Sequence, residues 1–362
     1  MRRIGIVGCG FIGTVHSYAL AMLVEAGLVD ACVTATYDSD AERAANTARQ
    51  HPGAVAVASV EDLLDRVDLV WVCTWTAAHA AVVGQAVERG LAVFCEKPLA
   101  PTWDECAHVA GLLTTVPHQV GLVLRYAPVF TAAAALVHDG RYGRHLATLM
   151  RDDQYLPTQG IYGSTWRGDV TLAGGGTLLE HSIHDVDLLR WLHGEPAEVS
   201  ARVHAGAGLA GIDDTANLTF AFADGSTAGL VSVWHQVLSR PSTRRLEIFC
   251  EDAVLWADDD HLGPLHVETS AGPEIVETEL PAWADRCRGP AELVVPLMMY
   301  ATPAKAFLDA LDAGSPGRPD AATALAAHRL VELAYRSSAA GGHPVATDTL
   351  ALPVPAPRRP PR

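Results

Sequence analysis

The sequence predicts an α/β protein with a doubly wound parallel sheet at its N-terminal end, followed by an α+β domain with a large open, mostly antiparallel sheet. Over the first 120 residues, short apolar runs alternate with helical stretches, which is the βαβ rhythm of a parallel sheet. After about residue 125, apolar residues recur at every second position instead. The length of 362 residues suits two domains, placed at 1–124 and 125–345, with a Pro-rich tail at 346–362.

The N-terminal domain is expected to contain five strands buried on both faces, because their apolar runs are continuous rather than alternating. Ala- and Glu-containing segments with helical spacing separate them. The expected strands are Ile4–Val7, Ala31–Thr36, Leu69–Thr74, Ala92–Cys95 and Gln119–Leu124, and the helices include Thr14–Ala26, Ala41–Gln50 and Ala78–Arg89.

The second domain should begin with a helix near 127–139 and contain an amphipathic helix near 177–192. Runs with a period of two follow, separated by turns such as Ala223–Ser226, and two Ala-rich helices close the fold at about 291–312 and 320–339. The last ten residues are Pro-rich and expected to be disordered or extended. The expected strands are Ala197–His204, Ala216–Ala223, Ser226–Trp234, Arg244–Cys250 and Ala253–Ala257.

Composition narrows the possible partners. Hydrophobic residues make up 49% of the chain and charged residues 19%, so a large core can form. The formal net charge of -16 repels phosphate backbones and anionic lipids, which argues against nucleic acid and membrane surfaces. Seven scattered cysteines form no CxxC pair, as expected for reduced thiols in a cytoplasmic protein. No signal peptide and no transmembrane helix are expected.

A glycine-rich motif follows the first expected strand. Gly8, Gly10 and Gly13 form a GxGxxG pattern that leads into a helix. The first glycine permits a tight turn, the second lets the backbone approach a pyrophosphate, and the third lets helix and strand pack closely. We expect the backbone around Phe11 and Ile12 to hold a dinucleotide, so residues 1–124 are interpreted as a Rossmann domain. A glycine turn without a ligand is the alternative.

Asp38 ends the second strand, about 25 residues after Gly13. A carboxylate at this point accepts hydrogen bonds from the adenosine ribose and repels a 2′-phosphate, which favours NAD over NADP. Ser39 and Arg43 can soften this preference, so NADP remains possible. Alternatively, Asp38 is an ordinary acid before the helix that starts after Asp40.

Glu96-Lys97-Pro98 directly follows the fourth strand, where an open parallel sheet forms its ligand crevice. A lysine there can hydrogen-bond a substrate oxygen and stabilise the alkoxide that develops during hydride transfer. Pro98 holds Lys97 in an extended conformation. The alternative is a solvated lysine.

A second dense stretch begins at Gly174-Gly175-Gly176. On one helix, Glu180, His184 and Asp187 would share a face, and the carboxylates would orient the imidazole for general acid or base chemistry. Two other interpretations compete. In one, the polar residues cap and solvate the start of a helix. In the other, Glu180, His181, His184 and Asp185 bind a metal such as zinc. Because no outside ligand is identifiable, no metal is expected.

These residues together resemble the glucose-fructose oxidoreductase, inositol dehydrogenase and MocA (Gfo/Idh/MocA) family. The resemblance extends to about residue 340, and the order and spacing of the motifs are specific. They are Gly8–Gly13, Asp38, Cys73-Thr74 through His79, Glu96-Lys97-Pro98, Arg125-Tyr126 and Gly174–Asp187.

The resemblance implies a Rossmann domain, a second domain whose open sheet forms homodimers or homotetramers, and Lys97 with His184 as the catalytic pair. Glu180 would assist them, and Asp187 would support His184. Further cofactor contacts would be Thr74, Trp75, His79, Glu96 and Lys97. The expected substrate contacts are Lys97, Arg125, Tyr155, Trp166, Arg167, Glu180, His181 and His184, with Tyr162 and His235 as additional wall residues.

Three positions depart from the family pattern. Glu180 stands where the family usually has Asp, and its extra methylene moves the carboxylate. Trp75 lies where the family has Thr-Pro-Asn, and its ring either stacks on cofactor or substrate or fills the fold. Val123 replaces an asparagine, which removes a polar contact and makes a fully hydroxylated hexose a less favoured substrate.

The sequence thus predicts an NAD(P)-dependent dehydrogenase or reductase acting on a secondary alcohol or ketone of a polyol, keto-sugar, sugar derivative or cyclitol. One alternative is an enzyme that cleaves or eliminates glycosides with tightly bound, internally recycled NAD. Another is a non-catalytic nucleotide-binding sensor.

Overall fold

The computed structural model describes residues 1–352 and contains two compact units. The first comprises residues 1–123 and 281–325, and the second comprises residues 124–280 and 326–352. The sequence-based division placed 281–325 in the second domain, whereas this segment clusters with the N-terminal unit because helix α9 (Ala291–Asp312) packs on helix α1 (Phe11–Glu25). The part of the Pro-rich tail from 353 onward lies outside the described residues.

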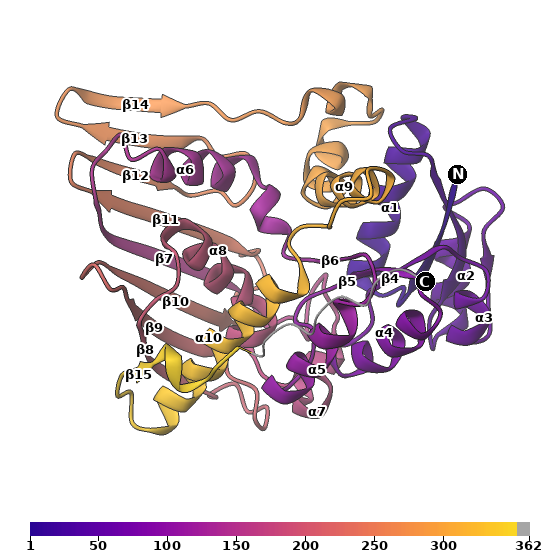
Figure 1. Ribbon diagram of the computed structural model, residues 1–362, viewed down its shortest axis with the longest axis horizontal. Coiled ribbons are helices and arrows are strands. Elements are labelled where there is room, and N and C mark those ends of the chain that lie inside the picture. Colours follow the sequence, from indigo (N-terminus) through magenta and orange to yellow (C-terminus); the bar gives the residue numbers. More distant parts are fainter. Residues whose placement is uncertain (353–362) are drawn as a thin grey trace. The chain divides into compact units, whose positions relative to one another are not determined.

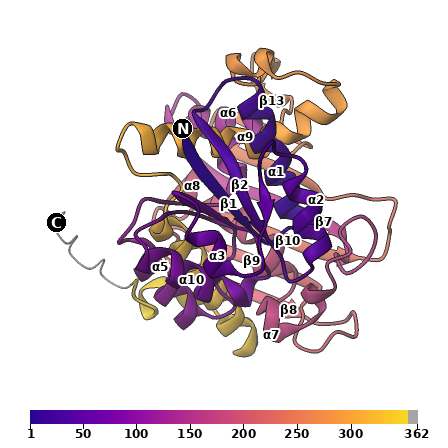
Figure 2. The same cartoon turned by 90° about the vertical axis from the view of Figure 1, so that its right-hand side faces the viewer.

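The first unit is built on a parallel sheet of six strands in the order β3-β2-β1-β4-β5-β6. The strand order reverses between β1 and β4, so the connecting helices lie on both faces of the sheet (Figure 2). The strands are β1 (Arg2–Val7), β2 (Ala31–Tyr37), β3 (Val55–Ala56), β4 (Leu69–Val72), β5 (Ala92–Cys95) and β6 (His118–Val120), and the other helices are α2 (Ala41–Ala48), α3 (Val60–Leu64), α4 (His79–Glu88) and α5 (Trp103–Leu113).

The core of this unit lies at strands β4 and β5, which are buried along their whole length. Trp71 stacks on Phe94 with their rings 4.7 Å apart. Continuous apolar runs therefore predicted these strands correctly. Strand β3 was missed because both of its residues are exposed, and the last strand ends at Val120 rather than 124 because a 3-10 turn (Val123–Tyr126) follows.

The second unit is built on a nine-stranded sheet in the order β14-β13-β12-β11-β7-β10-β9-β8-β15. Strands β7 and β10 pair in parallel, and the other described pairs are antiparallel. The strands are β7 (His145–Tyr155), β8 (Glu198–His204), β9 (Thr215–Ala221), β10 (Thr227–His235), β11 (Thr243–Cys250), β12 (Ala253–Ala257), β13 (Leu265–Thr269), β14 (Gly272–Val276) and β15 (Val345–Ala346).

Helices cover one face of this sheet (Figure 1). They are α6 (Pro128–His138), α8 (Ile183–His193) and the C-terminal part of α10 (Ala321–Ala339), with the short helix α7 (Val170–Ala173) preceding the glycine run. Along β7, Met150 and Asp152 are buried on the helix-covered side, whereas Leu149 and Arg151 are exposed on the other. The second face of the sheet is therefore open in the single chain.

Two sequence expectations for this unit need correction. Strand β7 lies in the middle of the sheet but was not predicted, because its buried end contains Asp152, Asp153 and Gln154. The helix expected at 177–192 is interrupted. Residues Thr177–His181 form a π-helical turn, closed by a bond from the Ser182 amide to the Thr177 carbonyl, before α8 begins at Ile183.

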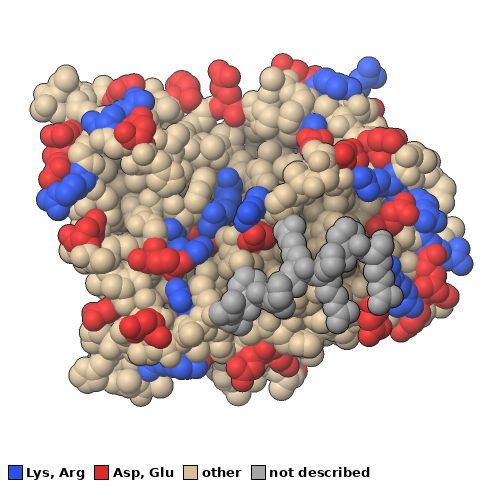
Figure 3. All heavy atoms as spheres, viewed as in Figure 1, with Lys and Arg blue, Asp and Glu red and all other residues tan. Residues whose placement is uncertain are grey.

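Acidic and basic side chains are interspersed over the described part of the face drawn in Figure 3. Among the described residues, no helix combines the length and the apolar character that a bilayer crossing requires.

Candidate active site

The N-terminal candidates follow four neighbouring parallel strands. The glycine motif follows β1, Asp38 follows β2, Thr74 lies beyond β4, and Glu96 and Lys97 follow β5. Because β2, β1, β4 and β5 are adjacent and parallel, their carboxyl ends meet at one edge of the sheet. The structure therefore brings these candidates together at this edge.

The glycine loop has room for a phosphate at one position only. Gly8 has φ +95°, and a Cβ on it would lie 2.5 Å from the backbone of Cys73. A Cβ on Gly13 would lie 1.9 Å from the Gly8 carbonyl oxygen. In contrast, a Cβ on Gly10 would have no other atom within 4 Å apart from its chain neighbours. Gly10 directly precedes α1, and its position provides no side-chain cap for the helix. This loop fits the pyrophosphate of a dinucleotide at a helix N-terminus.

The carboxylate of Asp38 is fixed by the glycine loop and the next turn. Its two oxygens accept the amides of Cys9 at 2.7 Å and Asp40 at 2.8 Å, and Ser39 Oγ lies 3.5 Å away. A carboxylate has about four acceptor positions, so acceptor capacity remains for ribose hydroxyls. Asp38 thus both ties β2 to the loop and suits the ribose contact expected from the sequence.

Glu96 is buried and turns its carboxylate toward the protein. Its Oε1 accepts a hydrogen bond from His16 Nε2 at 2.7 Å, and its Oε2 accepts the Lys97 amide at 3.1 Å. Burial alone would raise the pKa of Glu96, but His16 and Lys97 outweigh it and lower this pKa below its ordinary value. Glu96, expected at the cofactor, is observed holding the loop that contains Lys97.

His79 is also buried, with its ring between two loops. Its Nδ1 lies 3.0 Å from the Pro98 carbonyl oxygen and its Nε2 3.2 Å from the Thr74 carbonyl oxygen. The ring thus links the segment after β4 to the segment after β5. Trp75, next to Thr74, remains 38% exposed, which leaves its ring available for stacking.

In the second unit, Asp213 anchors the turn that precedes the expected catalytic helix. Its carboxylate accepts the amides of Gly176 at 2.7 Å and Leu178 at 2.9 Å, and the Tyr335 hydroxyl at 2.8 Å. Burial raises the pKa of Asp213, and the two amides oppose this. A Cβ on Gly176 would lie 1.8 Å from the Asp213 carbonyl oxygen, so this glycine is required for the close approach.

The two carboxylates expected to flank His184 are paired with arginines. Arg167 Nε lies 3.2 Å from Glu180 Oε2, and Arg125 donates to both oxygens of Asp187 at 2.6 and 2.7 Å. Burial raises the pKa of Asp187, and Arg125 opposes this. Glu180 lies in the π-helical turn, whereas His184 and Asp187 lie in α8, so the single α-helical face expected for the three residues is not formed.

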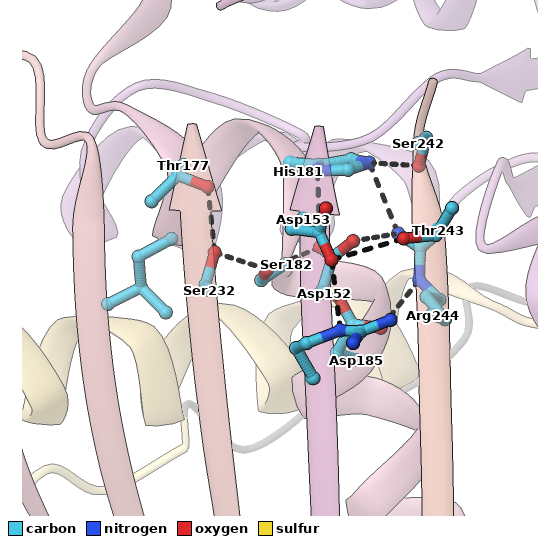
Figure 4. A network of polar contacts seen from close by, with 12 residues as sticks. Asp152, Asp153, Thr177, His181, Ser182, Asp185, Ser232, Ser242, Thr243 and Arg244 are labelled. Carbon is cyan, nitrogen blue, oxygen red and sulfur yellow. Dashed lines mark hydrogen bonds and ion pairs between the residues drawn. The ribbon is translucent and has the colours of Figure 1, made fainter. Parts of the chain in front are cut away.

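A buried polar network centred on Arg244 lies beside this turn (Figure 4). Arg244 contacts Asp185 at 2.7 Å, Asp260 at 2.9 Å and Asp152 at 3.4 Å. Burial opposes the charge on Arg244, but the carboxylates raise its pKa. Burial also raises the pKa of Asp152 well above its usual value. The charge of Arg244 lowers this pKa, whereas Asp185 raises it further. Hydroxyl groups extend the network from Asp152 through Ser182 and Ser232 to Thr177.

His181 belongs to this network through both ring nitrogens. Nδ1 lies 3.1 Å from Asp152, and Nε2 lies 3.3 Å from both Arg244 and Ser242 (Figure 4). A guanidinium only donates, so Nε2 accepts and Nδ1 carries the proton. His181 was expected to contact the substrate. The contacts observed for its ring are instead with other side chains of the protein.

The proposed wall residues have structural contacts of their own. The Tyr155 hydroxyl accepts the Ile161 amide at 3.0 Å, and its ring packs on Tyr162. Trp166 packs against a small apolar cluster that includes Trp234, and the Arg167 guanidinium stacks on Trp166 at 4.7 Å. His235 lies 3.3 Å from Asp153. Of these residues, Arg167 combines a fixed position with a cationic group.

Comparisons with known proteins agree with this geometry. A family model described as "Oxidoreductase family, NAD-binding Rossmann fold" matches residues 2–122, and a model of the GFO/IDH/MocA C-terminal domain matches residues 130–256. The two matches together cover more than half of the chain. The protein belongs to the Gfo/Idh/MocA oxidoreductase family.

Relatives within the Gfo/Idh/MocA family include named sugar and cyclitol enzymes. A 1,5-anhydro-D-fructose reductase of Ensifer adhaerens is 33% identical over 59% of this chain. The match spans 64% of that relative, which is less than two thirds of its length. An inositol 2-dehydrogenase of Rhizobium meliloti is 27% identical over 93% of this chain and 97% of that protein. A levoglucosan dehydrogenase solved with NADH and L-sorbose shares the fold, with TM-score 0.84, 21% identity and coverage of 96% and 99% of the two chains.

Sequence reasoning missed several residues that contact the candidate residues or their loops within each unit, namely His16 in the first unit and Asp152, Asp213 and Arg244 in the second. For Arg244 a signal existed, since it alternates with Leu246 and Ile248 along β11 and so points to the buried side. For the metal interpretation, the described residues contain no group of three or more His, Cys, Asp or Glu side chains arranged to hold an ion.

Proposed function

We propose that the protein is an NAD-dependent oxidoreductase that acts on a secondary alcohol or ketone of a sugar, sugar derivative or cyclitol. The observation that carries this proposal is the set of strand ends at which an open glycine loop, Asp38 and Lys97 meet. The names of the family members compared above support the substrate class. Asp38 favours NAD, because a fixed carboxylate repels the 2′-phosphate of NADP.

When bound, NAD supplies the nicotinamide that accepts or returns a hydride. Following the family resemblance, His184 takes the hydroxyl proton during oxidation, and the Lys97 ammonium stabilises negative charge on the same oxygen. We assign Arg167 to the binding of a substrate oxygen. Glu180 holds Arg167 in place, because Arg167 Nε donates to Glu180 Oε2 at 3.2 Å. Arg125 is the second candidate for substrate binding, and it is held by Asp187.

The test compares Lys97→Ala and His184→Ala with wild type on a panel of polyols and keto-sugars, followed by reduced-nicotinamide absorbance. Each variant should lose roughly 10²- to 10⁴-fold in kcat, the contribution of a positioned acid or base. Lys305→Ala and His343→Ala are the matched controls and should retain activity. Unchanged turnover in both active-site variants contradicts the proposal.

The same assay separates the two alternatives. Product without net change in the nicotinamide absorbance indicates internal recycling of NAD in glycoside cleavage or elimination. Calorimetric NAD binding without turnover on any substrate of the panel indicates a sensor.

We also propose that the protein is a cytoplasmic homo-oligomer that associates through the open face of the second sheet. The described cysteines are all free thiols, as in a reducing compartment. On the open face, Leu149 is 52% and Val231 40% exposed, on the central paired strands β7 and β10. Exposed apolar patches of this kind on a folded unit favour association with a second copy.

A further inference from the structure

Two buried histidines lie on either side of the segment that contains Lys97. His16 is on α1, the helix that begins at the glycine loop, and it is completely buried. His79 is the first residue of α4 and is 1% exposed. Each one contacts a residue adjacent to Lys97 in the chain, Glu96 in one case and Pro98 in the other. Neither histidine has a role in the proton and hydride transfers described above.

His16 fixes the carboxylate that precedes Lys97. The carboxylate only accepts, so Nε2 of His16 carries the proton in the 2.7 Å contact with Glu96. The ring is held edge-on by Phe94 at 5.1 Å and Tyr300 at 5.3 Å. On the other side, a Cβ on Gly121 would lie 2.5 Å from Glu96 Oε1, so the carboxylate fills its space closely. The second oxygen then orients the Lys97 backbone through its amide at 3.1 Å.

His79 fixes the carbonyl that follows Lys97. Its ring spans the Pro98 carbonyl at 3.0 Å and the Thr74 carbonyl at 3.2 Å. Carbonyl oxygens only accept, so the ring nitrogen that carries the proton donates to one of the two carbonyls, while the other ring nitrogen lies against the second. The contact therefore joins the loop after β4 to the loop after β5. It fixes the residue that follows Lys97, whereas His16 fixes the residue that precedes it.

We propose that His16 and His79 are positioning residues for Lys97, which hold Glu96 and Pro98 so that the lysine is presented from a fixed backbone. This inference rests on the proposed catalytic role of Lys97. It adds two links to the Lys97 segment. His16 connects it to α1 and so to the glycine loop, and His79 connects it to α4 and so to the loop after β4. A displacement of about 1 Å of a catalytic group costs on the order of 10²-fold in rate, so the ties should affect kcat.

The experiment uses the full chain with NAD and has two readouts. The first is the rate of acetic anhydride labelling of Lys97 as a function of pH, measured by peptide mass spectrometry. Lys97 and Lys305 are the two lysines of the chain, so Lys305 is an internal reference in every sample. The second readout is kcat, together with KM for NAD and for the substrate. The variants are His16→Ala, His16→Gln, His79→Ala and His79→Asn, with the exposed His108→Ala as the matched control.

We expect His16→Ala and His79→Ala to lower kcat roughly 10- to 100-fold, with a change in KM for NAD of less than about 3-fold. The pH profile of Lys97 labelling should change while that of Lys305 does not. His16→Gln should recover most of kcat, because its amide nitrogen replaces Nε2. His79→Asn should be intermediate, because its amide reaches only one of the two carbonyls.

The two conservative variants keep the test decisive if an alanine variant fails to fold. Folded variants with wild-type kcat and wild-type Lys97 labelling would overturn the positioning role while leaving the proposed function intact. Full turnover in Lys97→Ala would instead overturn the proposed function, and the labelling profile would still report whether the histidines fix the lysine. Equal losses in His16→Gln and His16→Ala would also contradict the inference, since rescue requires the Nε2 donor.

Discussion

At the scale of single residues, sequence patterns indicated the candidate reactive groups but not the groups that hold them. The placement of Lys97 and Asp38 at one edge of the sheet was predictable, because the carboxyl ends of neighbouring parallel strands converge. Their partners come from distant parts of the chain: His16 lies 80 residues from Glu96, and Asp213 lies 37 residues from Gly176. No local spacing connects such pairs, so only the folded chain reveals them.

The Asp152 carboxyl provides a prediction at this scale. It faces Arg244, Asp185, His181 and Ser182, and burial raises its pKa well above the usual value, with Arg244 opposing and Asp185 adding to the effect. The folded protein therefore keeps a proton that the unfolded chain releases above its pKa of about 3.9. Wild-type stability should fall as pH rises above this value, by up to ~1.4 kcal/mol per pH unit until the folded pKa is passed.

Asp152→Asn cannot titrate, so from pH 5 to pH 7.5 its free energy of unfolding should rise relative to that of wild type. Urea denaturation at both pH values measures the difference. The exposed Glu274→Gln on β14 is the control and should follow wild type. A gap between Asp152→Asn and wild type that is the same at both pH values would contradict a protonated Asp152.

At the scale of elements, the central strand β7 was not predicted, and it is the strand that contributes Asp152 and Asp153 to the network of Figure 4. Asp152 and Asp153 in β7 look like loop residues, because an unpaired buried carboxylate is costly. The cost is offset by Arg244 on β11 for Asp152 and by Arg240 for Asp153. Apolar periodicity therefore predicted β8 to β12 and failed at β7, where polar pairing replaces apolar packing; β13, β14 and β15 at the ends of the sheet were also not predicted.

The turn before α8 gives a prediction for an element. Gly176→Ala should destabilise the protein by roughly 1 to 3 kcal/mol, because the new methyl group would meet backbone at Asp213 that cannot rotate away. It should also lower kcat, since the displaced turn contains Glu180. Gly111→Ala in α5 has open space around its Cβ and should be neutral or stabilising by about 1 kcal/mol. Thermal unfolding and kcat of the two variants test this, and equal behaviour would show that the approach to Asp213 is not required.

At the scale of the whole chain, the sequence predicted the order of the two sheets but not how the described residues after 280 are shared between the units. Residues 281–325 cluster with the first unit, because α9 packs on α1, and 326–352 cluster with the second. Ala-rich helices have no pattern that identifies their partner. In the second unit, Ser337 and Ser338 of α10 donate to or accept from β8, which attaches this helix to the sheet by polar contacts.

The open face of the second sheet gives the prediction for the assembled protein. Leu149 pairs across the sheet with Gly229 and Glu247, and Arg151 pairs with Val231 and Arg245, so an apolar centre is surrounded by charges of both signs. A second copy related by a twofold axis can bury this centre and match the charges. Leu149→Asp should therefore shift the chain toward monomer in sedimentation equilibrium, because a carboxylate would be buried without a partner. Ile161→Asp, at a 73% exposed loop position outside the strands of this sheet, should leave the mass unchanged. A wild-type monomer at micromolar concentration, or equal masses for wild type and Leu149→Asp, would refute association through this face.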